Sequence, residues 1–400
     1  MEPELSDDQR LLLEATESFI KATLPLARVR ELIDTGVVIG PEYRKQAADL
    51  GWFAFLGPEE LGGGGVSGAG LRDAAIFAEL RGRCLQPGNF IDTNVVVSAL
   101  AAVGSPRQQE EVLPALAAGE SAAAWAVADP AGDWSGPAGV VASEADGGYR
   151  LSGVKGFVVE AQAADWLLVT AAGPGGPAQF LLPANAPGVT VAPMSGLDLS
   201  RRLCRVSFDD VPASPAAAVG PGPGPGAEAA VAAQLLVACV LSMAETVGAM
   251  QYLFDLSVQY SKDRIAFGRP IGSFQALKHQ LADTSLTVEL SHACAAGAAK
   301  AVQAADAGAA EAVSLAKSLI GDAAVEVAHK SWQIFGGISY TWEHDFHLYL
   351  RRLSTDASPY PSVRTKPNWP GRCSAGVMQL DAIFVPNCAA QNGTCRDGPR

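Results

Sequence analysis

A single carboxylate lies in the most apolar part of this chain. Glu245 is the only charged side chain between residues 229 and 254, and apolar residues surround it on almost every side of the expected helix. A buried carboxylate is costly unless it is paired or has a chemical task. Burial also raises the pKa of a carboxyl group, which favours a general base. Two interpretations of Glu245 therefore stay open, a base and a buried ion-pair partner.

A second group of residues has the chemistry of a phosphate site. The run RIAFGRPIGSFQ at residues 264–275 contains Arg264, Phe267, Phe274 and Gln275. A guanidinium offers two parallel donors to phosphate oxygens. The alternative is an exposed arginine without a ligand, and the specific spacing of the aromatic, glycine and glutamine residues around it favours the ligand.

A glycine pair could bring the backbone close to a bound molecule. Gln333, Gly336 and Gly337 follow a long segment with a helical apolar stripe, and glycine allows close approach of the chain to a ligand. Taken alone, the pair would be an ordinary helix C-cap.

Other chemical sites are not indicated. The glycine run at residues 62–65 has no strand before it and no Lys-Ser or Lys-Thr after it, which excludes a phosphate-binding P-loop. His344 and His347 are three residues apart but lack further ligands, so we expect no metal site.

The elements that must hold these residues divide the chain into parts of different texture. Helical periodicity, with Ser6 as an N-cap and Pro41 at a helix start, predicts helices in the first part. Short β-branched segments about ten residues apart predict a barrel or sandwich next. The fold class is α+β, mainly α. The expected parts are an N-terminal helical domain (1–120), a central β-domain (121–218), a Pro/Gly linker (219–228), a C-terminal helical bundle (229–352) and an irregular tail (353–400).

Composition excludes several classes of function. Apolar residues make up 48% of the chain and charged residues 18%, which is typical of a globular protein with a large core. The net charge of −13, without a basic run, argues against nucleic acid. Seven cysteines without a C-x-x-C pair, and no signal peptide, predict reduced thiols and a cytoplasmic location. The apolar run at 229–244 is too short for a membrane span, so we expect no membrane association.

The arginine segment and the glycine turn resemble the acyl-CoA dehydrogenase family, and the resemblance extends from about residue 5 to about residue 352. It implies an N-terminal helical domain, a central β-domain and a C-terminal four-helix bundle, assembled as dimers or tetramers with FAD at the subunit interface. The residues that the resemblance assigns to the pyrophosphate, ribityl and adenosine portions of FAD are Arg264, Phe267, Phe274, Gln275, Gln333, Gly336 and Gly337.

The same resemblance places the flavin ring against the central β-domain. Phe157, Val158 and Val159 stand where the family has an aromatic-Ile-Thr segment. Trp125, Val127 and Ala128 stand where it has a Tyr-x-Val-Thr motif. Val159 and Ala128 each replace a threonine, and each lost hydroxyl contributes about 1 kcal/mol net, which backbone donors can replace. The alternative is a β-domain that packs without a cofactor.

Desaturation of an acyl thioester needs a carboxylate to take the α-proton, and both usual family positions lack one here. Counting along the final helix reaches residues 359–361, and the position in the long helix is Ala238. Glu245 lies two turns beyond Ala238, roughly 10 Å along the helix. It is the candidate base, and pairing remains an equal alternative.

The resemblance implies a FAD-dependent oxidoreductase that forms an α,β-double bond in an acyl thioester on coenzyme A or a carrier protein. Electrons would pass to electron-transfer flavoprotein or to oxygen. Two alternatives stay open. One is a non-catalytic partner subunit of a hetero-oligomeric acyl-CoA dehydrogenase, which the absent base and the two lost threonines favour. The other is a diverged flavin oxidase or tailoring enzyme.

Overall fold

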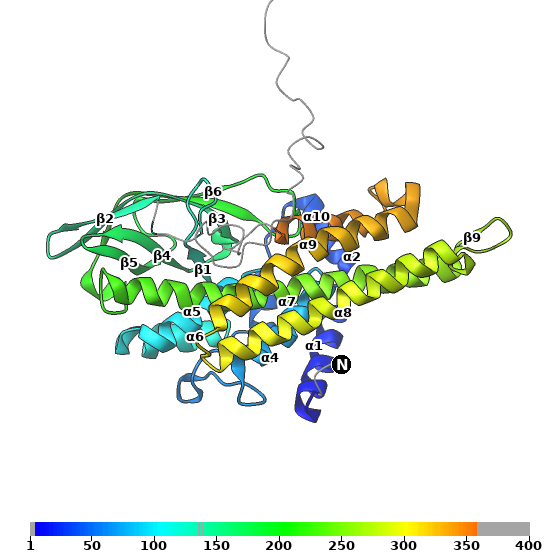
Figure 1. The fold of residues 1–400 in the computed structure, drawn as a ribbon. Coiled ribbons are helices and arrows are strands. Elements are labelled where there is room, and N and C mark those ends of the chain that lie inside the picture. The colour runs from blue at the N-terminus through cyan, green and yellow to red at the C-terminus, as the bar shows by residue number, and fades with distance from the viewer. Residues whose placement is uncertain (1–4, 135–136, 138, 358–400) are drawn as a thin grey trace, which may run out of the picture.

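The protein is organised along one helix, α7 (Pro225–Asp263), which extends from the β-sheet to the far end of the molecule (Figure 1). The computed structural model describes residues 5–134, 137 and 139–357. All side chains from residue 237 to residue 250 are buried, as the pattern around Glu245 predicts. By length and composition α7 could cross a membrane, but 61% of its most apolar window is buried in the protein, which is typical of a core helix.

The first 120 residues are helical, as expected. Ser6 caps the first helix: its Oγ accepts from the Gln9 amide at 3.1 Å, and Gln9 Oε1 accepts from the Ser6 amide at 2.9 Å. Pro41 begins a helix as predicted. The short helix α2 (Leu26–Thr35) was not predicted from the sequence. The helices are α1 (Asp7–Thr23), α2 (Leu26–Thr35), α3 (Pro41–Asp49), α4 (Gly70–Arg83), α5 (Phe90–Val103) and α6 (Leu113–Ala117).

The central segment forms a mixed sheet in the order β6-β7-β3-β2-β4-β5-β8, with β1 parallel to β4. The short segments expected to be extended in this part of the chain form β1 to β7, and the two-residue β8 was too short to predict. The strands are β1 (Ala123–Ala126), β2 (Val140–Ala145), β3 (Gly148–Val159), β4 (Trp166–Gly173), β5 (Gly176–Pro183), β6 (Val189–Pro193), β7 (Leu203–Ala213) and β8 (Ala218–Val219).

After α7 the chain turns through a short hairpin and returns along the bundle. The hairpin pairs β9 (Ile265–Ala266) with β10 (Arg269–Pro270), and it lies at the end of α7 far from the sheet (Figure 1). The bundle is completed by α8 (Gln275–Gln303), α9 (Ala309–Phe335) and α10 (Phe346–Asp356).

Two boundaries differ from the prediction. The long helix begins at Pro225, inside the expected linker, because proline is well suited to the first helical turn. Helical structure was expected to stop after residue 352, which is wrong, because α10 continues to Asp356 with Leu353 and Asp356 fully buried. Residues 358–400 of the expected tail lie outside the described residues.

Two glycines allow α4 and α7 to touch through their backbones. A Cβ on Gly82 would lie 1.8 Å from the carbonyl oxygen of Glu245, and a Cβ on Gly248 would lie 1.9 Å from the carbonyl oxygen of Glu79. No larger residue fits at either point. The close approach places Arg81, next to Gly82 on α4, beside the Glu245 side chain.

Candidate active site

A cavity of about 500 Å³ lies between the sheet and the helices, and we call it the central cavity. Residues on its sheet side include Gly132, Trp134, Phe157, Val159 and Leu203. Residues on its helical side include Arg81, Gln86, Asp92, Ser242 and Glu245. The cavity therefore brings two of the residues predicted to contact the flavin ring to the same space as the predicted base.

An irregularity in β3 directs Phe157 and Val159 into the cavity. The pairing of β3 with β7 shifts register between Lys155 and Val158, and Phe157 has a positive φ of 55°. A non-glycine residue adopts this backbone only where the surroundings enforce it, and such strain is often found at functional sites. Neighbouring side chains of a strand face opposite ways, so Val158 packs in the β-domain core instead of lining the cavity.

The other residues predicted at the ring end are buried behind the cavity wall. Trp125 is on β1, and Val127 and Ala128 follow it, all almost inaccessible to solvent. The Val127 carbonyl accepts from Lys155 Nζ at 2.9 Å, and the Ala128 carbonyl accepts from the Gly156 amide at 3.1 Å. The side chains of Val127 and Ala128 carry no hydrogen-bonding group, so only the backbone at these two positions can bond a ligand, as the loss of the threonine hydroxyl implied.

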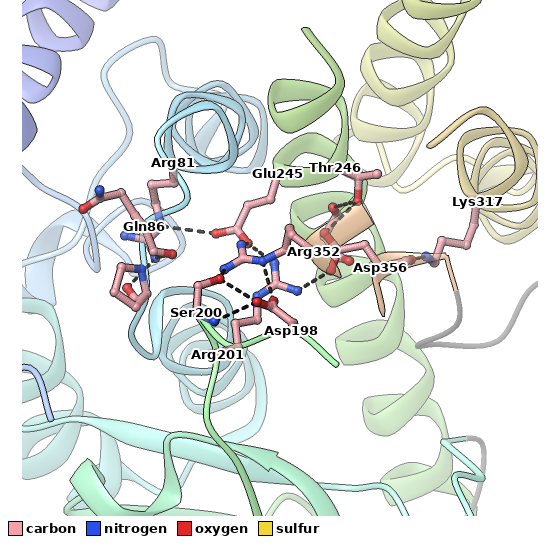
Figure 2. Close-up of polar contacts among 12 residues, drawn as sticks. Arg81, Gln86, Asp198, Ser200, Arg201, Glu245, Thr246, Lys317, Arg352 and Asp356 are labelled. Atoms are coloured by element: carbon pink, nitrogen blue, oxygen red, sulfur yellow. Dashed lines mark hydrogen bonds and ion pairs between the residues drawn. The ribbon is translucent and has the colours of Figure 1, made fainter. Parts of the chain in front are cut away.

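Glu245 is held by arginines from three different parts of the chain (Figure 2). Its Oε1 accepts from Arg81 Nε at 3.2 Å, while its Oε2 bonds Arg201 and lies 3.7 Å from Arg352 Nη1. The Arg81 guanidinium is itself clamped between two rings, 4.8 Å from the Trp52 centroid and 4.6 Å from the Phe90 centroid. These contacts confirm the ion-pair interpretation of Glu245.

Two aspartates complete the group. Arg352 Nε donates to Asp198 Oδ2 at 2.5 Å, and Arg201 also bonds Asp356. Ser200 Oγ accepts from Arg352 Nη2 at 2.6 Å. We call the six charged residues the buried ion-pair cluster, which has three charges of each sign. Its members are Arg81, Asp198, Arg201, Glu245, Arg352 and Asp356.

The expected rise in the pKa of Glu245 is wrong. Burial by itself raises the pKa of this carboxyl, but the charges of Arg201, Arg81 and Arg352 outweigh burial and lower the pKa below its ordinary value. A carboxylate stabilised in this way stays ionised at neutral pH and binds a proton only weakly. The catalytic role of Glu245 stays a prediction.

Sequence reasoning missed a second carboxyl in the central cavity. Asp92 is in the first turn of α5, which packs between β1 and α7, and its Oδ2 accepts from the Trp125 amide at 3.0 Å. Burial raises the pKa of Asp92 to about 7, because backbone amides and the charge of Arg201 offset only part of the desolvation. The sequence carries little signal for Asp92, because two other polar residues, Thr93 and Asn94, follow it directly.

The residues predicted to meet the rest of FAD lie away from this cavity. Arg264 and Phe267 are exposed at the β9–β10 hairpin, Phe267 by 95%. From Glu245 to Arg264 the helical rise is roughly 28 Å. Phe274 is half-buried. The other residues of this set are exposed: Gln275, Gln333, Gly336 and Gly337.

Comparison with known proteins identifies the family. Residues 6–120 match the acyl-CoA dehydrogenase N-terminal domain, and residues 224–358 match the acyl-CoA dehydrogenase C-terminal domain. The chain is 32% identical over 323 residues to acyl-CoA dehydrogenase IpdE2 of Mycobacterium tuberculosis, covering 80% of this chain and 83% of that protein. The chain belongs to the acyl-CoA dehydrogenase family. It is a FAD-dependent oxidoreductase that acts on CH–CH donors.

Solved structures of acyl-CoA dehydrogenases share the fold. The Tcur3481-Tcur3483 steroid ACAD is similar at a TM-score of 0.78 with 28% identity, covering 88% of this chain and 93% of that chain. A glutaryl-coenzyme A dehydrogenase in complex with glutaryl-CoA is similar at a TM-score of 0.80 with 24% identity, covering 89% and 92%. The second comparison supports the fold alone.

The central cavity suits the isoalloxazine ring of a flavin. The central cavity of this acyl-CoA dehydrogenase has an aromatic wall, with the Trp134 and Phe157 ring centroids 6.3 Å apart, which suits a planar heterocycle. The described residues contain no group of three or more His, Cys, Asp or Glu that could hold a metal ion.

Proposed function

We propose that this acyl-CoA dehydrogenase introduces an α,β-double bond into an acyl thioester bound in the central cavity. The observation that supports the proposal is the shared cavity, which joins Phe157 and Val159 on the sheet side to Glu245 on α7. Bound FAD would supply the hydride acceptor for the β-carbon. Phe157 and Val159 would flank the ring, and the backbone near Ala128 would donate to it.

Glu245 takes the α-proton in this proposal, and its arginine contacts lead to a specific pH profile. Because its pKa is lowered, the carboxylate is ionised throughout the range from pH 5 to pH 8. A base that is ionised over the whole range produces no acidic limb in the rate. A limb with a midpoint near pH 7 would instead point to Asp92.

We propose further that each flavin is shared between two subunits. Arg264 and Phe267 follow the end of α7, and the roughly 28 Å of helical rise between Glu245 and Arg264 puts them too far away to reach a flavin in the cavity of their own chain. The exposed hairpin that holds them can meet a neighbouring subunit. The Arg269 guanidinium lies 4.1 Å from the Phe274 ring centroid, which stabilises the hairpin. The exposed Arg264 guanidinium can donate hydrogen bonds to the pyrophosphate of the FAD bound by the neighbouring subunit.

Flavin spectroscopy tests both parts of this proposal. We expect purified protein to show a visible flavin band that bleaches on anaerobic addition of an acyl-CoA thioester. Arg264→Ala should retain the fold but release flavin more readily, while Arg107→Ala, a control in the exposed Arg107–Glu111 pair, should not. Equal flavin retention in both variants would contradict a role of the hairpin in FAD binding.

The rate at which the reduced flavin is reoxidised identifies the electron acceptor. We propose reoxidation by electron-transfer flavoprotein in the cytoplasm. Fast recovery of the flavin band with that protein, and slow recovery in air, would agree with this acceptor. Fast recovery in air alone would identify an oxidase instead.

A second candidate function is a partner subunit that completes the flavin site of a different chain. The tight pairing of Glu245 with three arginines favours it, because the pairing weakens the candidate base. A colourless protein that gains flavin and activity only when mixed with a second acyl-CoA dehydrogenase chain would establish this function.

A further inference from the structure

The central cavity has two chemically unlike ends. Its sheet side is mainly apolar and aromatic, with Trp134, Phe157 and Leu203. Its helical side is polar, where Asp92, Ser242 and Glu245 face the same space from α5 and α7. An unsubstituted hydrocarbon chain would bury these polar groups without replacing their contacts to water, which costs free energy for each group left unpaired. We therefore expect the polar end of the cavity to bind a polar group of the ligand.

Most charged groups at the polar end already have partners. The Arg81 guanidinium bonds Glu245 and the carbonyls of Gln86 and Pro87, the latter at 3.0 Å. The Gln86 amide donates to the Leu24 carbonyl at 3.0 Å. These donors are already bonded within the protein, so they are poor candidates for binding a substrate group.

Asp92 differs from its neighbours. It is 4% exposed and accepts from backbone amides of the sheet, Trp125 at 3.0 Å and also Val159. The cation whose charge acts on it, Arg201, directs its own ion pairs to other carboxylates. Because burial raises the pKa of Asp92 to about 7, the carboxyl is present near neutral pH in both forms. It can accept a hydrogen bond from a hydroxyl or donate one to a ketone.

Two hydroxyl groups line the same cavity from other helices. Ser242 is on α7, one turn before Glu245, and is almost completely buried. Thr355 is on α10, and its buried Oγ1 finds no hydrogen-bond partner among the described residues. A buried polar atom without a partner in the protein indicates a position that a ligand can satisfy.

We propose that Asp92, with the Ser242 hydroxyl, binds a hydroxyl or keto oxygen on the acyl group, so that the substrate is an oxygenated acyl thioester and not an unsubstituted fatty acyl thioester. This inference rests on the proposed dehydrogenase function of the same cavity. Asp92 and Ser242 act here as specificity-determining residues, because they contact the substrate beyond the carbons that react. A site built around such a bond discriminates against the analogue that lacks the oxygen, because the protein groups are then left unpaired.

The test compares octanoyl-CoA with its hydroxy and oxo derivatives, oxygenated at each carbon from C4 to C8. Calorimetric titration of the flavin-loaded protein gives binding constants, and anaerobic bleaching of the flavin gives reduction rates. We expect one derivative to bind about 100-fold more tightly than octanoyl-CoA. Asp92→Leu and Ser242→Ala should each reduce that preference, measured as the ratio of the two binding constants. Asp92→Asn, which keeps hydrogen-bonding capacity, should retain part of it.

Each outcome separates this inference from the proposed function. Equal binding of octanoyl-CoA and all derivatives, or an unchanged preference in both Ser242→Ala and Asp92→Asn, would overturn the inference. Loss of bleaching with every thioester in Asp92→Asn, with binding intact, would also overturn it and make Asp92 the proton acceptor. A clear binding preference without bleaching by any thioester would support the inference and refute the dehydrogenase function of this chain alone.

Discussion

Replacing Glu245 with glutamine should destabilise the whole protein, because this side chain stands at the centre of the buried ion-pair cluster. The substitution keeps the shape of the side chain and removes its charge. Arg81 and Arg352, with side chains at most 2% exposed, would then lose a counter-charge that they cannot replace with water. The cluster would change from three charges of each sign to an excess of one positive charge.

The size of the effect follows from the contacts. Each guanidinium 3–4 Å from the carboxylate contributes about 4 kcal/mol of attraction at an effective dielectric constant near 20, and the cost of burying the carboxylate offsets much of the sum. Removing one partner of a buried pair typically costs about 3–5 kcal/mol. For a chain of this length we expect a decrease in the melting temperature on the order of 5 °C.

Calorimetry of wild type and Glu245→Gln measures the effect, with Glu17→Gln as the control. Glu17 Oε1 pairs with Lys21 Nζ at 2.8 Å on the surface of α1, where such a pair contributes less than about 1 kcal/mol. Adding Arg81→Gln to Glu245→Gln should cost less than the two single changes together. If Glu245→Gln melts within a degree of wild type, or shifts no more than Glu17→Gln, the cluster does not stabilise the fold as argued.

Three further predictions concern packing, pH and capping. Gly248→Ala should cost more than about 3 kcal/mol of stability, because the added Cβ would clash with the Glu79 carbonyl. Gly297→Ala, in open space on α8, should instead stabilise the protein by up to about 1 kcal/mol. Thermal melts of both variants measure the difference, and equal effects would contradict the packing argument. The pKa of Asp92 is higher in the folded protein than in the unfolded chain. Wild type should therefore lose stability relative to Asp92→Asn as pH rises from about 4 to about 7, by up to about 1.4 kcal/mol per pH unit. A stability difference that does not change with pH would contradict the raised pKa. Ser6→Ala removes a capping box and should cost about 1 kcal/mol in urea unfolding, while no loss would show that the first turn of α1 does not contribute.

Elements with strong local signals were predictable from the sequence. The Ser6 cap, the helix start at Pro41 and the short extended segments of the β-domain were correctly predicted, because each depends on neighbouring residues alone. The helix α2 was missed because a ten-residue helix between Pro25 and Gly36 has few residues to show periodicity. Helix ends such as Asp356 were missed because a buried polar residue interrupts an apolar stripe.

The site was only partly predictable, and the reason is that its chemistry depends on contacts between distant segments. The burial of Glu245 was predicted correctly, but the direction of its pKa shift was not, because the sequence indicates burial and does not indicate which residues pair with the carboxylate. Arg81 and Arg201 are 164 and 44 residues away from Glu245 along the chain. No spacing rule connects them.

The glycine contacts explain how such distant residues meet. Gly82 follows Arg81 directly, and Gly248 lies one turn after Glu245, so the two points of backbone contact between α4 and α7 flank the ion pair on both sides. From the sequence alone, each glycine predicts only a helix that is locally less stable, by about 1 kcal/mol relative to alanine. In the fold the same two residues set the distance between the helices. A carboxylate and a glycine three residues apart in one apolar helix, with an Arg-Gly pair in another, therefore indicate a buried ion pair more specifically than the carboxylate alone.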